Sequence, residues 1–188
     1  MSMTGILGDY RAFFAMQRRR LSARGIDISG CAISHLAYRT RTHRAYLAAR
    51  DAIERHCDAA VENVWNGRPI SKLLLTDPLD LDDGFTTDLV ELIPPTHRGR
   101  YEMGLEHVGV VIGATVDQFG RRHRAALTGQ QFQGPLCNPY FVTFDDHTNV
   151  KFYRYALMDV CLREGRRFDG FDHVDHVDHQ PDAAARQR

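Results

Sequence analysis

The sequence of 188 residues lacks any excess of charge, because 24 Lys and Arg residues balance 24 Asp and Glu residues. Surfaces that bind nucleic acid are usually strongly basic, so this balance gives no support for a nucleic-acid partner. No apolar run reaches the roughly 20 residues that a membrane helix needs. The first ten residues also lack the charged-then-apolar order of a signal peptide. We therefore expect a cytoplasmic protein that binds neither nucleic acid nor a membrane.

Paired cysteines and the common catalytic signatures are also missing. None of the four cysteines forms a CxxC or other close pair, which gives no support for a zinc knuckle or a redox motif. Free thiols in a reducing compartment are the expected state. Glycine-rich phosphate loops, GxSxG elbows and HExxH motifs are absent as well.

An ordered series of short apolar segments fills most of the chain. The spacing of Tyr10, Phe13 and Phe14 predicts an amphipathic helix over residues 10–23. A strand, a helix and three further strands follow, and we place them at 31–38, 42–59, 61–65, 70–75 and 85–93. Asn66-Gly67 is a strong signal for a hairpin between two of these strands, and residues 78–84 are typical of an acidic loop.

The same order of elements recurs in the second half, as a strand at 105–112, a helix at 115–127 and strands near Gln131, at 140–144 and at 149–155. The sequence thus predicts an α+β fold of two paired βαβββ modules, at about 29–95 and 103–156, with an N-terminal helix. A helix at 157–164 closes a single domain over residues 1–164. Residues 165–188, with their Asp-His-Val repeat, are typical of a low-complexity, unstructured tail.

Strand alternation points to a metal site. Successive side chains face opposite sides of a sheet, and this places His35, Glu91, His107 and Tyr153 opposite the apolar faces of their strands. If the polar faces meet, two imidazoles and one carboxylate converge. That trio with open positions is the arrangement of non-haem Fe(II) oxygenases. The alternative is that each histidine is a hydrogen-bonded structural residue.

Several short segments also resemble a known family. They are Cys31-Ala-Ile-Ser-His-Leu-Ala-Tyr-Arg39, Asn66-Gly-Arg-Pro-Ile70, Val90-Glu-Leu92, Glu106-His-Val108, Asn138-Pro139 and Val150-Lys-Phe152. In this order they are similar to the YecM-like proteins, a branch of the vicinal oxygen chelate superfamily. The resemblance implies paired βαβββ modules and a metal site with one ligand from the first and last strand of each module. By position these ligands are His35, Glu91, His107 and the residue at 153.

Tyr153 departs from the family pattern, in which the fourth position holds His or Glu. A phenol with an ordinary pKa near 10 is a poor divalent ligand. We therefore favour three protein ligands with Tyr153 beside them as a hydrogen-bond donor or acid/base, over ligation by a phenolate. Arg39 and Lys151 share strand parity with His35 and Tyr153, which makes them candidates to hold a substrate carboxylate or phosphate.

The resemblance implies a metal-dependent enzyme whose small substrate binds the metal through carboxylate, carbonyl or hydroxyl oxygen atoms. The two-histidine, one-carboxylate trio favours an Fe(II)-dependent oxygenase. The alternatives are an isomerase or lyase of the glyoxalase type and a non-catalytic small-molecule-binding protein. Zn, Ni and Mn are alternatives to Fe(II), since first-row ions compete for such ligands. A homodimer is compatible with the sequence.

Overall fold

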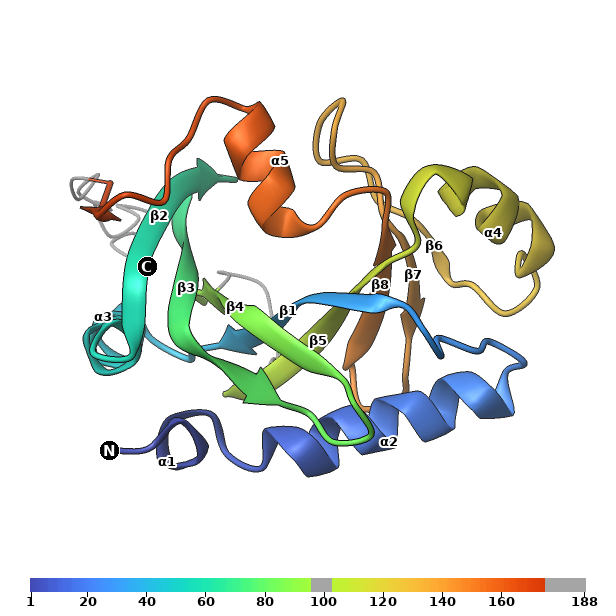
Figure 1. Cartoon of the computed structure of the whole chain (residues 1–188), viewed down its shortest axis with the longest axis horizontal. Coiled ribbons are helices and arrows are strands. Elements are labelled where there is room, and N and C mark those ends of the chain that lie inside the picture. Colours follow the sequence, from blue (N-terminus) through green and yellow to red (C-terminus); the bar gives the residue numbers. More distant parts are fainter. Residues whose placement is uncertain (96–102, 175–188) are drawn as a thin grey trace, which may run out of the picture.

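One curved nine-stranded sheet organises the computed structural model, which describes residues 1–95 and 103–174 (Figure 1). Its strands lie in the order β6 (Gly129–Gln130), β7 (Tyr140–Thr143), β8 (Asn149–Tyr153), β5 (Gly104–Val111), β1 (Ala32–Arg39), β4 (Thr86–Ile93), β3 (Arg68–Asp80), β2 (Cys57–Trp65) and β9 (Phe171–Asp172). The first and last strands of the two halves therefore lie together at the centre of the sheet.

The sheet confirms the two predicted modules. The first comprises β1, helix α3 (His43–Glu54), β2, β3 and β4, and β1 pairs with β4 in parallel. The second comprises β5, the short 3-10 turn η1 (Gly113–Thr115) with helix α4 (Val116–Arg122), β6, β7 and β8, and β5 pairs with β8 in parallel. Antiparallel pairing of β1 with β5 joins the modules. A parallel pair at the same place in each module gives the sheet an approximate internal twofold symmetry.

Local sequence accounts for the first module. The Thr42 hydroxyl accepts a hydrogen bond from the Ala45 amide and caps α3, which buries Tyr46, Ala49 and Ile53. The helix ends at Glu54 and not near residue 59 as expected, because the chain enters β2 at Cys57. Asn66 and Gly67 turn the chain between β2 and β3 with positive φ angles of 49° and 71°, as the hairpin signal predicts.

Three elements differ from the sequence prediction. β3 continues through Asp80, so the acidic loop expected at 78–84 is reduced to a short turn in which Asp82, Asp83 and Gly84 have positive φ. A short helix, α1 (Met3–Leu7), precedes α2 (Tyr10–Ala23), the N-terminal helix that was predicted. α4 ends at Arg122, several residues earlier than expected.

The helices divide between the two sides of the curved sheet. α1, α2, α3 and α4 lie outside it, whereas α5 (Leu157–Arg163) lies across its open, concave side (Figure 1). The main core forms under the outer helices, where Phe14 and Leu21 of α2 meet Leu36, Val108 and Phe152. The central strands thus turn their apolar side chains toward the outer helices. Their polar side chains face the concave side of the sheet.

The beginning of the expected tail is part of the sheet, which corrects the expectation of an unstructured tail for residues 165–174. Ala60 and Val61 of β2 pair in parallel with Phe171 and Asp172 of β9. The Val174 amide then donates to the buried carboxylate of Glu62 at 3.0 Å. Composition did not reveal this strand because its two residues lie in a segment rich in Asp and His.

Residues 175–188, including His176 and His179, lie outside the described part of the chain. Among the described helices, none is long and apolar enough to cross a membrane. A cytoplasmic location and a homodimer stay predictions.

Candidate metal centre

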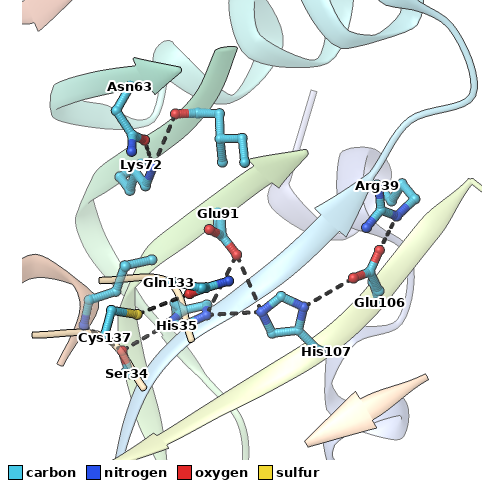
Figure 2. Close-up of polar contacts among 12 residues, drawn as sticks. Ser34, His35, Arg39, Asn63, Lys72, Glu91, Glu106, His107, Gln133 and Cys137 are labelled. Atoms are coloured by element: carbon cyan, nitrogen blue, oxygen red, sulfur yellow. Dashed lines mark hydrogen bonds and ion pairs between the residues drawn. The ribbon is translucent and has the colours of Figure 1, made fainter. Parts of the chain in front are cut away.

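Three side chains predicted as ligands lie together on the concave side of the sheet (Figure 2). His35 comes from β1, Glu91 from β4 and His107 from β5. The two Nε2 atoms are 3.1 Å apart, and Glu91 Oε2 lies 3.8 Å from Nε2 of His35 and 3.3 Å from Nε2 of His107. Both histidines are fully buried. Strand parity therefore predicted the convergence of the trio correctly.

The separations between the ligand atoms match a shared ion. With bonds of about 2.1 Å, two ligands lie about 3.0 Å apart at a right angle, about 3.4 Å apart in a tetrahedron and about 4.2 Å apart on opposite sides of the ion. All three observed separations are below the last value. The trio would thus occupy one side of an ion and leave the other side to small molecules.

Two β-bulges orient the histidines. In the pairing of β1 with β5, Ile33 faces Val110 but His35 faces Gly109, so that Ser34 is an extra residue. Likewise Ala37 faces His107 but Tyr38 faces Leu105, so that Glu106 is extra on β5. A bulge re-aims the side chain of its extra residue. Ser34 and Glu106 consequently reach their neighbouring histidines, although simple alternation places them on the opposite face.

The Ser34 hydroxyl holds the far side of the His35 ring. Its Oγ lies 2.8 Å from His35 Nδ1 and accepts a hydrogen bond of 2.7 Å from the Leu157 amide at the start of α5. When Nδ1–H of His35 donates to Oγ, the lone pair of Nε2 points toward the trio, which is the form that binds a metal. α5 is thereby linked to the ligand in β1.

Glu106 does the same for His107. Its Oε1 lies 3.3 Å from His107 Nδ1, and its other oxygen accepts a hydrogen bond from Arg39 Nε. A carboxylate that accepts from a ligating imidazole fixes the ring and increases its basicity. Burial would raise the pKa of Glu106, but the hydrogen bonds from His107 and Arg39 outweigh it and lower the pKa to about 2. Glu106 is thus ionised at neutral pH.

Arg39 departs from its expected role. Its guanidinium is buried, pairs with Glu106 and also donates to the Pro94 carbonyl at 3.4 Å. We expected Arg39 to hold a substrate anion, but this arrangement makes it a residue that positions Glu106, and through Glu106 the ring of His107.

The electrostatic state of the trio suits a divalent ion. Burial lowers the pKa of His35 to about 3, so the imidazole is neutral and its lone pair is free at neutral pH. For Glu91, burial acts to raise the pKa, but the contact with His107 Nε2 at 3.3 Å and the charges around the carboxylate outweigh burial and hold the pKa below its ordinary value. A neutral imidazole beside an ionised carboxylate is the form in which both bind metals.

The position equivalent to Glu91 in the second module is Lys151, not Tyr153. Glu91 pairs with Ala37, two residues after His35, and Lys151 pairs with Gly109, two residues after His107. This corrects our placement of Tyr153 as the fourth ligand position. With a lysine at that position, the group of His, Cys, Asp and Glu side chains that could hold an ion here, among the residues that the structure describes, consists of His35, Glu91 and His107.

Tyr153 lies beside the trio instead. Its ring centroid is 5.5 Å from that of His35 in an edge-on contact, and its side chain packs with Cys137 and Val160. Burial raises the pKa of Tyr153 well above its ordinary value. Among the described residues, no hydrogen bond to its hydroxyl is present. Tyr153 is therefore a neutral phenol at the edge of the site.

Two small apolar clusters border the trio. One contains Ala37, Ile70 and Ile93 with Trp65 packed against it. The other contains Cys137, Tyr153 and Val160 beneath α5, where burial raises the pKa of the Cys137 thiol to about 12. The Cys137 thiol also donates to Gln133 Oε1 at 3.0 Å (Figure 2). The site therefore has polar groups at its centre and apolar walls on both sides.

The family follows from the sequence match. A model of the YecM protein family matches residues 2–135, which is more than half of the chain. The chain belongs to the YecM family. Protein YecM of Escherichia coli (strain K12) is 23% identical to it over 155 residues, which cover 74% of this chain and 82% of that protein. This is the resemblance expected from the short motifs.

Solved structures support the fold of this YecM-family chain. The structure of Protein EC4020, a structural genomics target, has a TM-score of 0.63 and 24% identity over 87% of this chain and 97% of that chain. A methylmalonyl-CoA epimerase of Streptomyces coelicolor has a TM-score of 0.44 and 14% identity over 64% of this chain and 94% of that chain. The second similarity is too low to carry an argument. The paired βαβββ modules are the topology of the vicinal oxygen chelate fold.

Proposed function

We propose that this YecM-family protein is a metal-dependent enzyme of the vicinal oxygen chelate type, with the metal held by His35, Glu91 and His107. The observation that carries the proposal is the convergence of three ligand atoms that lie 3.1, 3.3 and 3.8 Å from one another. The substrate of the proposed enzyme is a small molecule with neighbouring oxygen atoms. A bound divalent ion supplies Lewis-acid stabilisation of negative charge on such oxygens.

The supporting groups argue for a metal and against a structural role for the histidines. The two Nε2 atoms lie 3.1 Å apart, so in the metal-free protein one of them must carry a proton and donate a hydrogen bond to the other. The Nδ1 atoms face Ser34 and Glu106, as expected when hydrogen-bond acceptors orient metal-binding imidazoles. An ion between the two Nε2 atoms would satisfy both lone pairs together with Glu91.

Among metal-dependent reactions, we propose Fe(II)-dependent oxygenation. Two histidines and one carboxylate on one side of an ion are typical of non-haem Fe(II) oxygenases, because the opposite side accepts substrate and dioxygen. The positively charged Lys151 at the position equivalent to Glu91 supports three protein ligands and not four. The protein's part is to keep the trio oriented through Ser34 and Glu106 and to exclude water with its apolar walls.

The decisive experiment uses the full chain with His176→Ala and His179→Ala, which we call the tail-substituted chain. These two substitutions remove imidazoles that would compete for the metal. Divalent metals are then added to this chain. Metal content is measured first, and one ion per chain is expected. Oxygen consumption is then recorded with Fe(II) and a panel of catechols, 2-oxo acids and 2-hydroxy acids. His107→Gln should abolish both the stoichiometric metal binding and the oxygen consumption. His123 lies at the C-terminal end of α4, and the control His123→Gln should leave both unchanged.

The outcomes separate the alternatives. Substrate conversion with oxygen uptake that requires Fe(II) supports the oxygenase. Conversion that proceeds without oxygen and equally well with Ni(II) or Zn(II) would replace it with an isomerase or lyase. Stoichiometric metal with ligand binding but no conversion would point to a non-catalytic binding protein. Failure to bind one ion per chain would overturn the metal-dependent function altogether.

A further inference from the structure

The lysines of this protein have an unusual distribution. The chain holds 24 Lys and Arg residues, and only two of them, Lys72 and Lys151, are lysines. Lys72 in β3 pairs with Glu91 of β4, and Lys151 in β8 pairs with Gly109 of β5. Paired residues of neighbouring strands point to the same face. Both lysines thus project from the concave face, one on each side of the metal trio.

Lys72 is a buried cation without a carboxylate partner. Its side chain is only 3% exposed, and its Nζ donates to Asn63 Oδ1 and to the Ile70 carbonyl, which are neutral acceptors (Figure 2). In the described part of the chain it forms no ion pair. An ammonium has three protons, so one remains after these two bonds. A buried charge whose hydrogen-bond partners are neutral is costly, so a negatively charged group bound beside Lys72 would stabilise it.

Lys151 reverses the charge at the position that corresponds to Glu91. It is only partly buried and forms no ion pair among the residues that the structure describes. Its partner Gly109 is in turn paired with His35 of β1, and Lys72 is paired with Glu91, so each lysine lies in one row across the strands with a ligand of the trio. Both ammonium groups are therefore near enough to act on a molecule bound at the trio.

The charges at the site do not balance without a further anion. Glu106 is neutralised by Arg39, which leaves Glu91 and the solvent-exposed Glu164 to oppose two lysines. A divalent ion would add two more positive charges. Cations crowded in a shielded site repel one another unless an anion lies among them. Lysine suits this purpose better than arginine, since it is a compact point charge with rotatable donors.

We propose that Lys72 and Lys151 form an anion-binding pair that makes this site selective for a dianionic, oxygen-chelating substrate such as a dicarboxylate. The proposal rests on the metal-dependent function, because the chelating oxygens bind the ion held by His35, Glu91 and His107. The two lysines then match the charge of the substrate, Lys72 from the β3 side and Lys151 from the β8 side. Neither is a metal ligand.

The test uses the tail-substituted full chain loaded with Co(II) and three probes of one skeleton that differ in charge. These are oxalate, its monoamide oxamate and the neutral diamide oxamide. Co(II) content and affinity are measured first, and probe binding is then followed by the absorption of Co(II). The variants are Lys72→Met and Lys151→Met. Arg154→Met is the matched control, since it removes one positive charge that is paired with Asp117 away from the trio.

The proposal predicts that the lysine variants lower the affinity for the anion but do not lower the affinity for the metal. Each lysine variant should weaken oxalate binding by about ten-fold or more, as expected for a charge-assisted contact, and should reduce the preference for oxalate over oxamide. Co(II) should bind as tightly as in the parent or more tightly, because a repelling charge is lost. Arg154→Met should change neither affinity. A role in folding alone would not produce this pattern.

Three results would contradict it. One Co(II) per chain with oxalate affinity within about two-fold of the parent in both lysine variants would overturn the anion pair and leave the metal proposal intact. An equal loss in Arg154→Met would reduce the effect to overall charge. No stoichiometric Co(II) in the parent would overturn both proposals. Should Lys72→Met fail to fold, Lys151→Met decides the question alone, since its side chain is partly exposed.

Discussion

The ring of His35 occupies the space that a side chain at Gly109 would need. A Cβ at residue 109 would lie 2.4 Å from His35 Cε1 and 2.6 Å from its Nδ1. Gly109 is the residue of β5 that pairs with His35 across the central strands. The second module thus accommodates the ligand of the first through a missing side chain, two residues after its own ligand His107.

Gly109→Ala should therefore displace the His35 imidazole and lower metal affinity by at least ten-fold, while much of the fold persists. The reason is steric, because a contact of 2.4 Å forces the ring to move. Gly170→Ala is the matched control, since a Cβ there meets no atom within 4 Å. Metal titration of both variants is the measurement, and equal affinities would disprove the steric role of Gly109.

Glu106→Gln should weaken metal binding by about 10–100-fold, the usual effect of losing a carboxylate that orients a ligating histidine. Ser34→Ala should have a smaller effect, because a hydroxyl is a weaker acceptor than a carboxylate. Both variants are compared by metal titration at pH 7 together with thermal unfolding of the metal-free protein. A larger loss in Ser34→Ala than in Glu106→Gln would contradict this assignment of roles.

Tyr153→Phe should leave metal affinity within about two-fold of the parent, because a neutral phenol whose pKa lies well above its ordinary value is not a ligand. The Fe(III) form of the parent should accordingly show no phenolate-to-iron charge-transfer band. Such a band in the parent, and its disappearance in Tyr153→Phe, would show that Tyr153 ligates the metal after all.

Glu62 is expected to make the protein sensitive to acid. Burial acts to raise its pKa, but hydrogen bonds from Tyr46, Arg50 and Ser71 outweigh burial and hold the pKa below the ordinary 4.5. The unfolded chain then takes up a proton more readily than the folded one. The stabilisation is complete above pH 4.5 and is lost as the pH falls through the lower folded value.

Glu62→Gln should therefore flatten the fall in the free energy of unfolding below pH 4.5, as measured by urea titration across pH 3–7. At pH 7 the variant should be less stable by about 1–3 kcal/mol, because buried partners lose a charged acceptor. Asp145→Asn, which removes an exposed carboxylate, is the control. An unchanged pH profile in Glu62→Gln would contradict the role of this network.

Alternation of side chains was sufficient to predict the trio, but not its support. His35, Glu91 and His107 lie on central strands whose apolar neighbours mark the opposite face, and the bulges beside the two histidines leave both on the concave face. Ser34 and Glu106 were not predicted, because bulges turn their side chains toward the histidines, whereas regular alternation places them on the opposite face. A bulge depends on how two strands pair, so it cannot be predicted from the sequence of one strand alone.

The remaining differences have similar causes. Tyr153 was placed two residues from the position that the β5–β8 register gives to Lys151, because register is a property of a pair of strands. Lys72 was overlooked as one cation in an apolar strand, although the scarcity of lysine in the sequence was a signal that could have found it. β9 is two residues long and depends on contacts with β2 and Glu62.

The central claim is that one divalent ion binds between His35, Glu91 and His107. X-ray absorption spectroscopy of the tail-substituted chain with one equivalent of Fe(II) tests it most directly. We predict two imidazole ligands and a carboxylate at roughly 2.0–2.3 Å, with one imidazole lost in His35→Gln and one in His107→Gln. A spectrum without imidazole ligands, or one unchanged in both variants, would contradict the claim.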